Sequence, residues 1–218
     1  MEPIQGNVSI DAQNIMPVIK KWLYSDKDIF IREVVSNGCD AITKLRMVDS
    51  RLAQGASVRV QVDKAAKELR FIDDGVGMTE EEVKTNINQV AFSGAKSFLE
   101  EYAKTEGKDG EENGIIGHFG LGFYSVFMVA DKVTIDTLSF REGATPVRWE
   151  SEDGMAFTMT EGTRQTRGTT ITLHISDAEE EFLNVWRVRE VLERYCSFMA
   201  VPIYLKEMIF VRLHFYFH

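Results

Sequence analysis

The segment Asp-Asp-Gly-Val-Gly-Met at 73–78 carries the clearest chemical signal in the sequence. It follows a strand-like run at 68–72 and precedes the helix start Thr-Glu-Glu-Glu at 79–82. A carboxylate at a strand end, followed by two glycines, brings bare backbone close to a flat or anionic ligand. The same residue types also suit an ordinary surface turn. The choice between these interpretations depends on what lies upstream and downstream.

A stripe of polar residues follows one side of the helix that the sequence predicts from Asp28 to about Asp49. Its members are Glu33, Asn37, Asp40 and Lys44, which fall within about 60° of one another on a helical wheel. A carboxylate and an amide one turn apart orient a water and hold Mg²⁺ through oxygen, and Glu33 at a pocket wall polarises a water for attack on phosphorus. The alternative is a solvated helix face with an Asp40–Lys44 pair.

A glycine-rich segment, Gly-Ile-Ile-Gly-His-Phe-Gly-Leu-Gly-Phe at 114–123, leads into a predicted helix at 123–129. Glycines just before a helix N-terminus leave backbone N–H groups and the positive end of the helix dipole available to phosphate. The spacing differs from the Gly-x-x-x-x-Gly-Lys-Ser/Thr loop, and the dinucleotide fingerprint is absent in its strand–helix context. Residues 94–122 as a whole predict either a mobile flap or a plain loop.

The elements that must position these residues alternate between helices and strands. We expect an edge strand at 8–11, helices at 12–24, 28–49, 79–90, 123–129 and 178–199, and strands at 58–62, 69–72, 132–138, 147–150, 156–160 and 169–175. A capping box, Thr79-x-x-Glu82, begins the third helix. The last four strands read as an antiparallel meander. The order predicts an α+β fold, a two-layer sandwich of a mostly antiparallel sheet with helices on one face.

Composition limits the functional classes. The 218 residues carry a net charge of −9, from 34 acidic and 25 basic residues, which argues against a nucleic-acid groove. The 2 cysteines form neither a disulfide framework nor a zinc spacing. No signal peptide and no apolar run long enough for a bilayer is evident. We therefore expect a cytoplasmic protein that does not bind membranes.

The three motifs, in this order, resemble the GHKL ATPase superfamily, and their details resemble the N-terminal ATPase domain of its heat-shock protein 90 chaperones. The matching segments are Ile-Arg-Glu-Val-Val-Ser-Asn-Gly-Cys-Asp-Ala at 31–41, Ala-Phe-Ser-Gly-Ala-Lys-Ser-Phe at 91–98, the glycine hinge and following helix at 116–131, and Arg-Gly-Thr at 167–169. The opening, through Trp-Leu-Tyr-Ser at 22–25, is most similar to bacterial members. The resemblance runs from about residue 6 to 205 and implies a Bergerat-type ATP-binding fold.

The resemblance also implies how the base of ATP or ADP would be read. Asp73 would accept a hydrogen bond from the adenine amino group, and Thr169 would help through a water. Gly77 and Met78 would line the base.

For the phosphates, the resemblance implies that Asn37 ligates Mg²⁺ and that Glu33 is the general base for the attacking water. The further nucleotide contacts would be Asp40, Lys44, Asn86 and the backbone amides of Gly120, Leu121, Gly122 and Phe123. Two positions depart from the family pattern: Phe92 replaces a usual lysine, and His118 replaces a usual glutamine. The loss of that lysine removes a phosphate-facing cation.

We interpret residues 1–205 as the nucleotide-binding domain, with a lid at about 94–122, and 206–218 as a tail that either starts a linker or is foreign to the domain. The implied protein is a dimeric stress-response chaperone that binds unfolded client proteins. Its ATP hydrolysis would be weak in this chain alone, because the middle domain is absent. Two alternatives stay open: a DNA-topology or repair ATPase, recognisable by salt-dependent DNA binding, and a non-enzymatic interaction module, recognisable by the absence of stabilisation by nucleotide.

Overall fold

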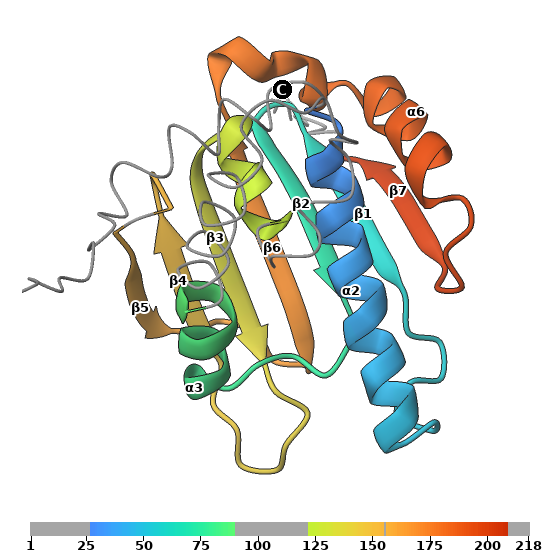
Figure 1. The fold of residues 1–218 in the computed structure, drawn as a ribbon, viewed down its shortest axis with the longest axis vertical. Helices are drawn as coiled ribbons and strands as arrows, with labels where there is room; N and C mark the ends of the chain where they lie inside the picture. The colour runs from blue at the N-terminus through green and yellow to red at the C-terminus, as the bar shows by residue number, and fades with distance from the viewer. Residues whose placement is uncertain (1–26, 90–121, 155, 209–218) are drawn as a thin grey trace, which may run out of the picture.

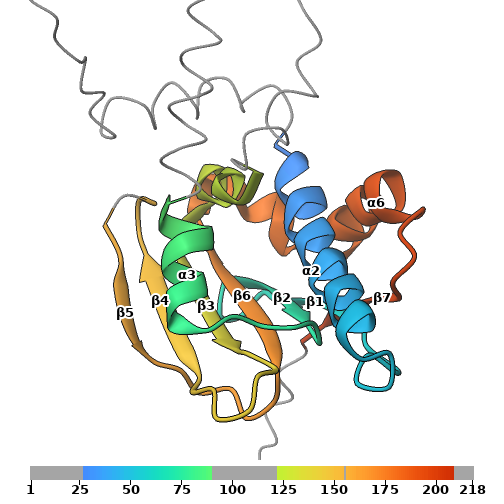
Figure 2. The same cartoon turned by 60° about the horizontal axis from the view of Figure 1, so that its bottom comes forward.

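The computed structural model describes residues 27–89, 122–154 and 156–208. They form one seven-stranded sheet with helices over one face (Figures 1 and 2), which confirms the predicted α+β class. The strands are β1 (Val58–Asp63), β2 (Glu68–Asp73), β3 (Ala130–Leu138), β4 (Val147–Ser151), β5 (Thr158–Glu161), β6 (Gly168–Ile175) and β7 (Ile203–Glu207). Their order is β5-β4-β3-β6-β2-β1-β7. Every neighbouring pair is antiparallel except β1 and β7.

The helical elements of the described ranges are α2 (Ile29–Val48), α3 (Glu80–Val83), the π-helix η1 (Lys84–Gln89), the 3-10 helices η2 (Gly122–Met128) and η3 (Asp177–Leu183), and α6 (Val185–Cys196). The predicted capping box is present, because Thr79 accepts from the Glu82 N–H and Glu82 accepts from the Thr79 N–H. No helix in these ranges combines the length and apolar character that crossing a bilayer requires.

The long helix α2 is fixed to the sheet by its apolar face. Its buried residues are Ile29, Phe30, Ile31, Val34, Val35, Gly38, Cys39, Ile42 and Leu45. Phe30 packs edge-on against Phe71 of β2 and Phe182 of η3, with ring centroids 6.4 Å and 4.9 Å apart. Burying a side chain of this size contributes roughly 1.5–3 kcal/mol. Since the apolar face is fixed, the polar stripe beside it is held at the edge of the helix–sheet interface.

Strand β6 corrects the predicted meander. Strands β3, β4 and β5 are joined consecutively, but β6 pairs with β3 on one side and β2 on the other. The residue pattern indicates a strand without indicating its partners, so the expected neighbour β5 was wrong. This central position brings the start of β6 beside the end of β2, where Asp73 is the Cα partner of Thr169.

The end of the described chain also differs from prediction. The expected helix at 178–199 is divided into η3 and α6 by Asn184, whose backbone is extended and whose side chain accepts from the Trp186 N–H at 2.9 Å. An N-cap of this kind begins a new helix rather than continuing the old one. Strand β7 was not predicted; it joins the sheet parallel to β1. The predicted elements at 8–11 and 12–24 lie outside the described residues.

Candidate functional site

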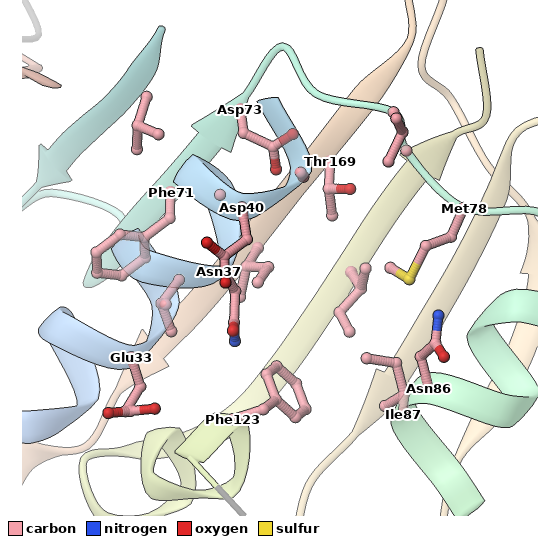
Figure 3. Close-up of a pocket in the computed structure, with 18 of the residues that line it drawn as sticks. Glu33, Asn37, Asp40, Phe71, Asp73, Met78, Asn86, Ile87, Phe123 and Thr169 are labelled. Carbon is pink, nitrogen blue, oxygen red and sulfur yellow. The ribbon is translucent and has the colours of Figure 1, made fainter. Parts of the chain in front are cut away.

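A cavity of about 490 Å³ lies between α2, η1, η2 and the helix-covered face of the sheet (Figure 3). Its walls take residues from each of the polar and glycine motifs of the sequence. The predicted residues that line it are Glu33, Asn37, Asp40, Lys44, Asp73, Gly77, Met78, Asn86, Gly122, Phe123 and Thr169. The structure thus brings together segments that are distant in the sequence. Gly120, Leu121, Phe92, His118 and the lid interval 94–121 lie outside the described residues.

Asp73 is the last residue of β2 and stands at one end of the cavity beside Thr169 (Figure 3). Only 8% of its surface is exposed. Burial raises the pKa of its carboxyl from 3.8 to about 6, against the opposing effects of hydrogen bonds from the Gly75 and Thr169 backbone and of the charge on Arg164. A carboxylate so nearly removed from water is a strong and selective hydrogen-bond acceptor.

The two glycines after Asp73 are required by neighbouring protein backbone. Gly77 has φ +60°, and a Cβ there would lie 1.9 Å from the carbonyl oxygen of Leu138. A Cβ on Gly75 would lie 2.5 Å from the Cβ of Ala41 on α2. The sequence analysis expected bare backbone to face a ligand. The structure gives an additional reason, because this loop is packed between α2 and the end of β3.

Hydrogen bonds hold the same loop in place. The Val76 N–H donates to the Ala41 carbonyl at 3.2 Å, and the Phe140 N–H donates to the Val76 carbonyl at 2.8 Å. The Met78 N–H donates to Thr137 Oγ1 at 3.0 Å, and Thr137 Oγ1 lies 3.0 Å from Thr169 Oγ1. Thr137 therefore links the loop to the residue that was predicted to assist at the base. It was missed in the sequence because nothing but its place in β3 marks it.

Glu33 stands at the opposite end of the cavity, near Phe123 (Figure 3). Arg32 Nη2 lies 2.7 Å from Glu33 Oε1. The other carboxylate oxygen, Oε2, is packed against Gly122, where an added Cβ would lie only 2.1 Å from it. The glycine at the start of η2 therefore leaves the room that this carboxylate occupies.

The remaining polar residues follow the wall between these ends. Asn37 and Asp40 project from α2 toward the cavity (Figure 3), and Asn86 lies on η1 across from them. Within the described part of the chain, Asp40 and Lys44 form no ion pair with each other. The stripe therefore lines the cavity, while Asn37, Asp40 and Lys44 remain exposed to solvent.

The apolar lining was not singled out in the sequence, because its members are ordinary core residues of several elements. It consists of Val34, Val58, Phe71, Ile72, Val76, Ile87, Ile135 and Ile171. Tyr124 ties η2 to η1 through a hydrogen bond from its hydroxyl to the Ile87 carbonyl at 3.0 Å. Apolar walls with a few fixed polar groups are typical of sites for small organic ligands.

The donor set fits a cation that arrives with a ligand better than a protein-held metal. Among the described residues, no group of three or more His, Cys, Asp or Glu side chains could hold a metal ion. Mg²⁺ in nucleotide sites takes one or two protein oxygens and completes its shell with phosphates and water. The Asn37 amide on the cavity wall can supply one such oxygen.

Comparison with known proteins relates this arrangement to one family. Residues 28–152, more than half of the chain, match the family described as "Histidine kinase-, DNA gyrase B-, and HSP90-like ATPase". The chain is 46% identical over 204 residues to the "Chaperone protein HtpG" of Porphyromonas gingivalis strain W83, covering 91% of this chain and 29% of that protein. It is 42% identical over 206 residues to the protein of the same name from Methylococcus capsulatus, covering 90% of this chain and 32% of that protein. The chain thus spans about a third of the length of these relatives.

Proposed function

This chain belongs to the histidine kinase-, DNA gyrase B- and HSP90-like ATPase family, and from that premise we propose that its cavity binds ATP and ADP with Mg²⁺. The observation that carries the proposal is the cavity's polarity: a buried carboxylate at one end, and an acid, an amide and a glycine-bounded helix start at the other. Between them the walls are apolar, as a purine and a ribose require. The cavity volume of about 490 Å³ suits a ligand of nucleotide size.

The base end supports recognition of adenine. The Asp73 carboxylate accepts a hydrogen bond from the exocyclic amino group, while Thr169 contributes through a water and Gly77 and Met78 line the base. A guanine base presents a carbonyl oxygen at the corresponding position. Two buried acceptors would then face each other without a proton between them, which is strongly unfavourable.

The opposite end supports phosphate binding. Asn37 supplies an amide oxygen to Mg²⁺, and Asp40, Lys44 and Asn86 contact the nucleotide or its hydration shell. The backbone N–H groups of Gly122 and Phe123 begin η2 and face the phosphates, and Gly120 and Leu121 continue this role as a prediction from the sequence. Mg²⁺, when bound with the nucleotide, neutralises phosphate charge.

Glu33 is the proposed general base. One carboxylate oxygen is held by Arg32, and the other lies against the Gly122 backbone, where phosphate is expected. In hydrolysis, a water attacks the γ-phosphorus, the bond to the bridging oxygen of ADP breaks, and Glu33 accepts the proton of the water. We expect slow turnover by this chain alone, since relatives extend well beyond it.

We propose that this chain serves a molecular chaperone, as the relatives are named. We further propose that its ATPase cycle acts on unfolded client proteins and that it functions as a cytoplasmic homodimer. The nucleotide-binding domain is proposed to span residues 1–205. The sheet hydrogen bonding continues to Met208, whose N–H donates to the Val62 carbonyl at 2.8 Å, so the tail begins inside the last strand.

Isothermal calorimetry on the 218-residue chain tests the nucleotide proposal. We expect Mg-ATP and Mg-ADP to bind one equivalent each, and Mg-GDP to bind at least about 100-fold more weakly because its base leaves Asp73 unpaired. Equal affinities for Mg-ADP and Mg-GDP would show that Asp73 does not select adenine over guanine. No binding of either adenine nucleotide would reject the function.

A further inference from the structure

The loop at 162–167 between β5 and β6 carries two half-buried arginines, Arg164 and Arg167, and Arg164 bonds the Asp73 backbone at the base end of the cavity. Arg164 does not line the cavity. Its Nη1 donates to Thr170 Oγ1 at 2.6 Å, and its Nη2 donates to the Arg167 carbonyl at 2.9 Å and to the Asp73 carbonyl at 3.4 Å. One planar guanidinium therefore spans the end of β2 and the start of β6.

The loop that carries Arg164 is itself fixed to the sheet. The Thr163 N–H donates to both carboxylate oxygens of Asp136, at 3.1 Å and 3.0 Å, and the Arg164 N–H donates to the same side chain at 3.3 Å. Asp136 lies on β3 and is only 8% exposed. The guanidinium thus projects from an anchored backbone and not from a free loop tip.

The space that Arg164 closes leaves no room for adjustment. Gly168 has φ +110°, and a Cβ there would lie 2.1 Å from the Asp73 carbonyl oxygen and 3.0 Å from Arg164 Nη2. Asp73 and Thr169 form the last paired register of β2 and β6. Thr137 Oγ1 also donates to the Gly168 carbonyl at 3.2 Å. Arg164 and Thr137 therefore both bond the backbone at these strand ends.

We propose that Arg164 is a positioning residue for base recognition, which holds the end of β2 against the start of β6 so that the Asp73 carboxylate and the Thr169 hydroxyl face one edge of adenine. This inference rests on the proposed role of Asp73. It adds a residue behind the cavity wall to those that contact the ligand.

The charge of Arg164 has a measurable effect on the pKa of Asp73. Among the described residues, Arg164 forms no ion pair, but its charge interacts with the carboxylates of Asp73, Asp74 and Asp136. It lowers the pKa of Asp73 and opposes the larger raising effect of burial. Removal of the charge should therefore move the pKa of Asp73 above about 6, toward neutral pH.

The other titratable groups near Asp73 should not obscure the change in its pKa. Asp74 raises the Asp73 pKa, but it is itself paired with Arg59 of β1 at 2.7 Å. From α2, burial raises the pKa of the Cys39 thiol to about 11, so this thiol is neutral at physiological pH. The remaining charged groups that line the cavity are Glu33, Asp40, Lys44 and Glu82. None of these is changed by a substitution at Arg164.

The test compares Arg164→Gln with Arg164→Lys, which keeps the charge but loses the planar fork. Arg70→Gln is the matched control, because Arg70 lies on the same strand β2 and bonds Glu68 away from the cavity. Circular dichroism checks that each 218-residue variant folds. Two quantities are measured between pH 5 and pH 8: Mg-ADP affinity, and the titration of the Asp73 carboxyl carbon by NMR without nucleotide.

For Arg164→Gln, we expect several-fold weaker Mg-ADP binding at pH 8, a loss that grows as pH falls to 6.5, and an Asp73 titration midpoint moved to higher pH. Arg164→Lys should keep the Asp73 midpoint of the unmodified chain but lose affinity for Mg-ADP at pH 8. Arg70→Gln should change neither the midpoint nor the affinity. An unchanged Asp73 midpoint in Arg164→Gln, or the same fold-loss at every pH, would overturn the inference. If the unmodified chain binds no Mg-ADP at pH 8, the proposed function fails, and the Asp73 midpoint still decides whether Arg164 controls this carboxyl.

Discussion

The two ends of the cavity are built in different ways. The base end is made where strands stop: Asp73 closes β2, Thr169 opens β6, and the loop carrying Gly77 touches the Leu138 carbonyl at the end of β3. The opposite end is made of side chains on one helix, α2, that meet the first residue of η2. Sheet backbone fixes the first end, and side-chain packing fixes the second.

Substitutions at the two ends should therefore affect stability and catalysis differently. A change at the base end must disturb strand ends that many hydrogen bonds hold, so it should affect folding as well as binding. A change at the α2 end can be absorbed by the far end of a flexible side chain, so it should affect the reaction while the fold persists. Substitutions at both ends of the cavity and a pH titration test this comparison.

The largest effect is expected for Gly77→Ala. A Cβ at Gly77 would meet the Leu138 carbonyl oxygen at 1.9 Å with φ at +60°, whereas Gly55 has φ +74° with nothing within 4 Å. We expect Gly77→Ala to lower the free energy of unfolding by at least about 3 kcal/mol, and Gly55→Ala by only about 1 kcal/mol. Urea denaturation measures both. Equal losses would show that the contact with Leu138 does not control this loop.

Glu33→Ala should abolish hydrolysis while leaving binding intact. Loss of a positioned general base slows the reaction by at least about 100-fold. The Mg-ADP affinity and the urea midpoint should stay close to those of the unmodified chain, because Glu33 is a partly exposed residue at the cavity end. Single-turnover hydrolysis with excess protein gives the rate. A retained rate would reject Glu33 as the base.

Gly122→Ala probes the same carboxylate from the other side. The new Cβ would lie 2.1 Å from Glu33 Oε2, the mobile end of a side chain, so Glu33 must turn away. We expect a loss of about tenfold in the hydrolysis rate from misplacement, with a change in the free energy of unfolding below about 1 kcal/mol. A loss of stability as large as that of Gly77→Ala would contradict the contrast between the two ends.

The pH dependence should come from the base end. Adenine binding needs the ionised Asp73 carboxylate, and burial raises the pKa of this group to about 6. The Mg-ADP association constant should therefore fall about tenfold per pH unit below 6 and be flat above it. Calorimetry from pH 5 to pH 8 gives this profile. A profile without a break near pH 6 would show that ionisation of Asp73 does not control adenine binding.

The stability of the nucleotide-free chain should change with pH in the opposite sense. Because the Asp73 pKa is raised from 3.8, its contribution to stability is fully present below pH 3.8 and is lost as pH rises through about 6. Asp73→Asn should accordingly stabilise the nucleotide-free chain at pH 8, by up to roughly 3 kcal/mol.

Sequence patterns predicted the two layers, α2 with its polar stripe, the strands β1 and β2 and the capping box at Thr79, because each is encoded by local spacing. The position of β6 was not predictable, since a strand pattern carries no information about its partners. Thr137 and Arg164 were missed for a related reason: each bonds a backbone carbonyl of a segment distant in the chain, Thr137 that of Gly168 and Arg164 that of Asp73. The need for Gly77 was recognised, but its contact with Leu138 required the fold.

Thermal unfolding with Mg-ADP tests the proposed nucleotide site most directly, on the unmodified chain and on Asp73→Asn at pH 8. At 100 times the dissociation constant, we expect Mg-ADP to stabilise the unmodified chain by about 2.7 kcal/mol. The same concentration should barely stabilise Asp73→Asn, although this variant is more stable without nucleotide. Equal stabilisation of both chains by Mg-ADP, or none of the unmodified chain, would contradict an adenine site at Asp73.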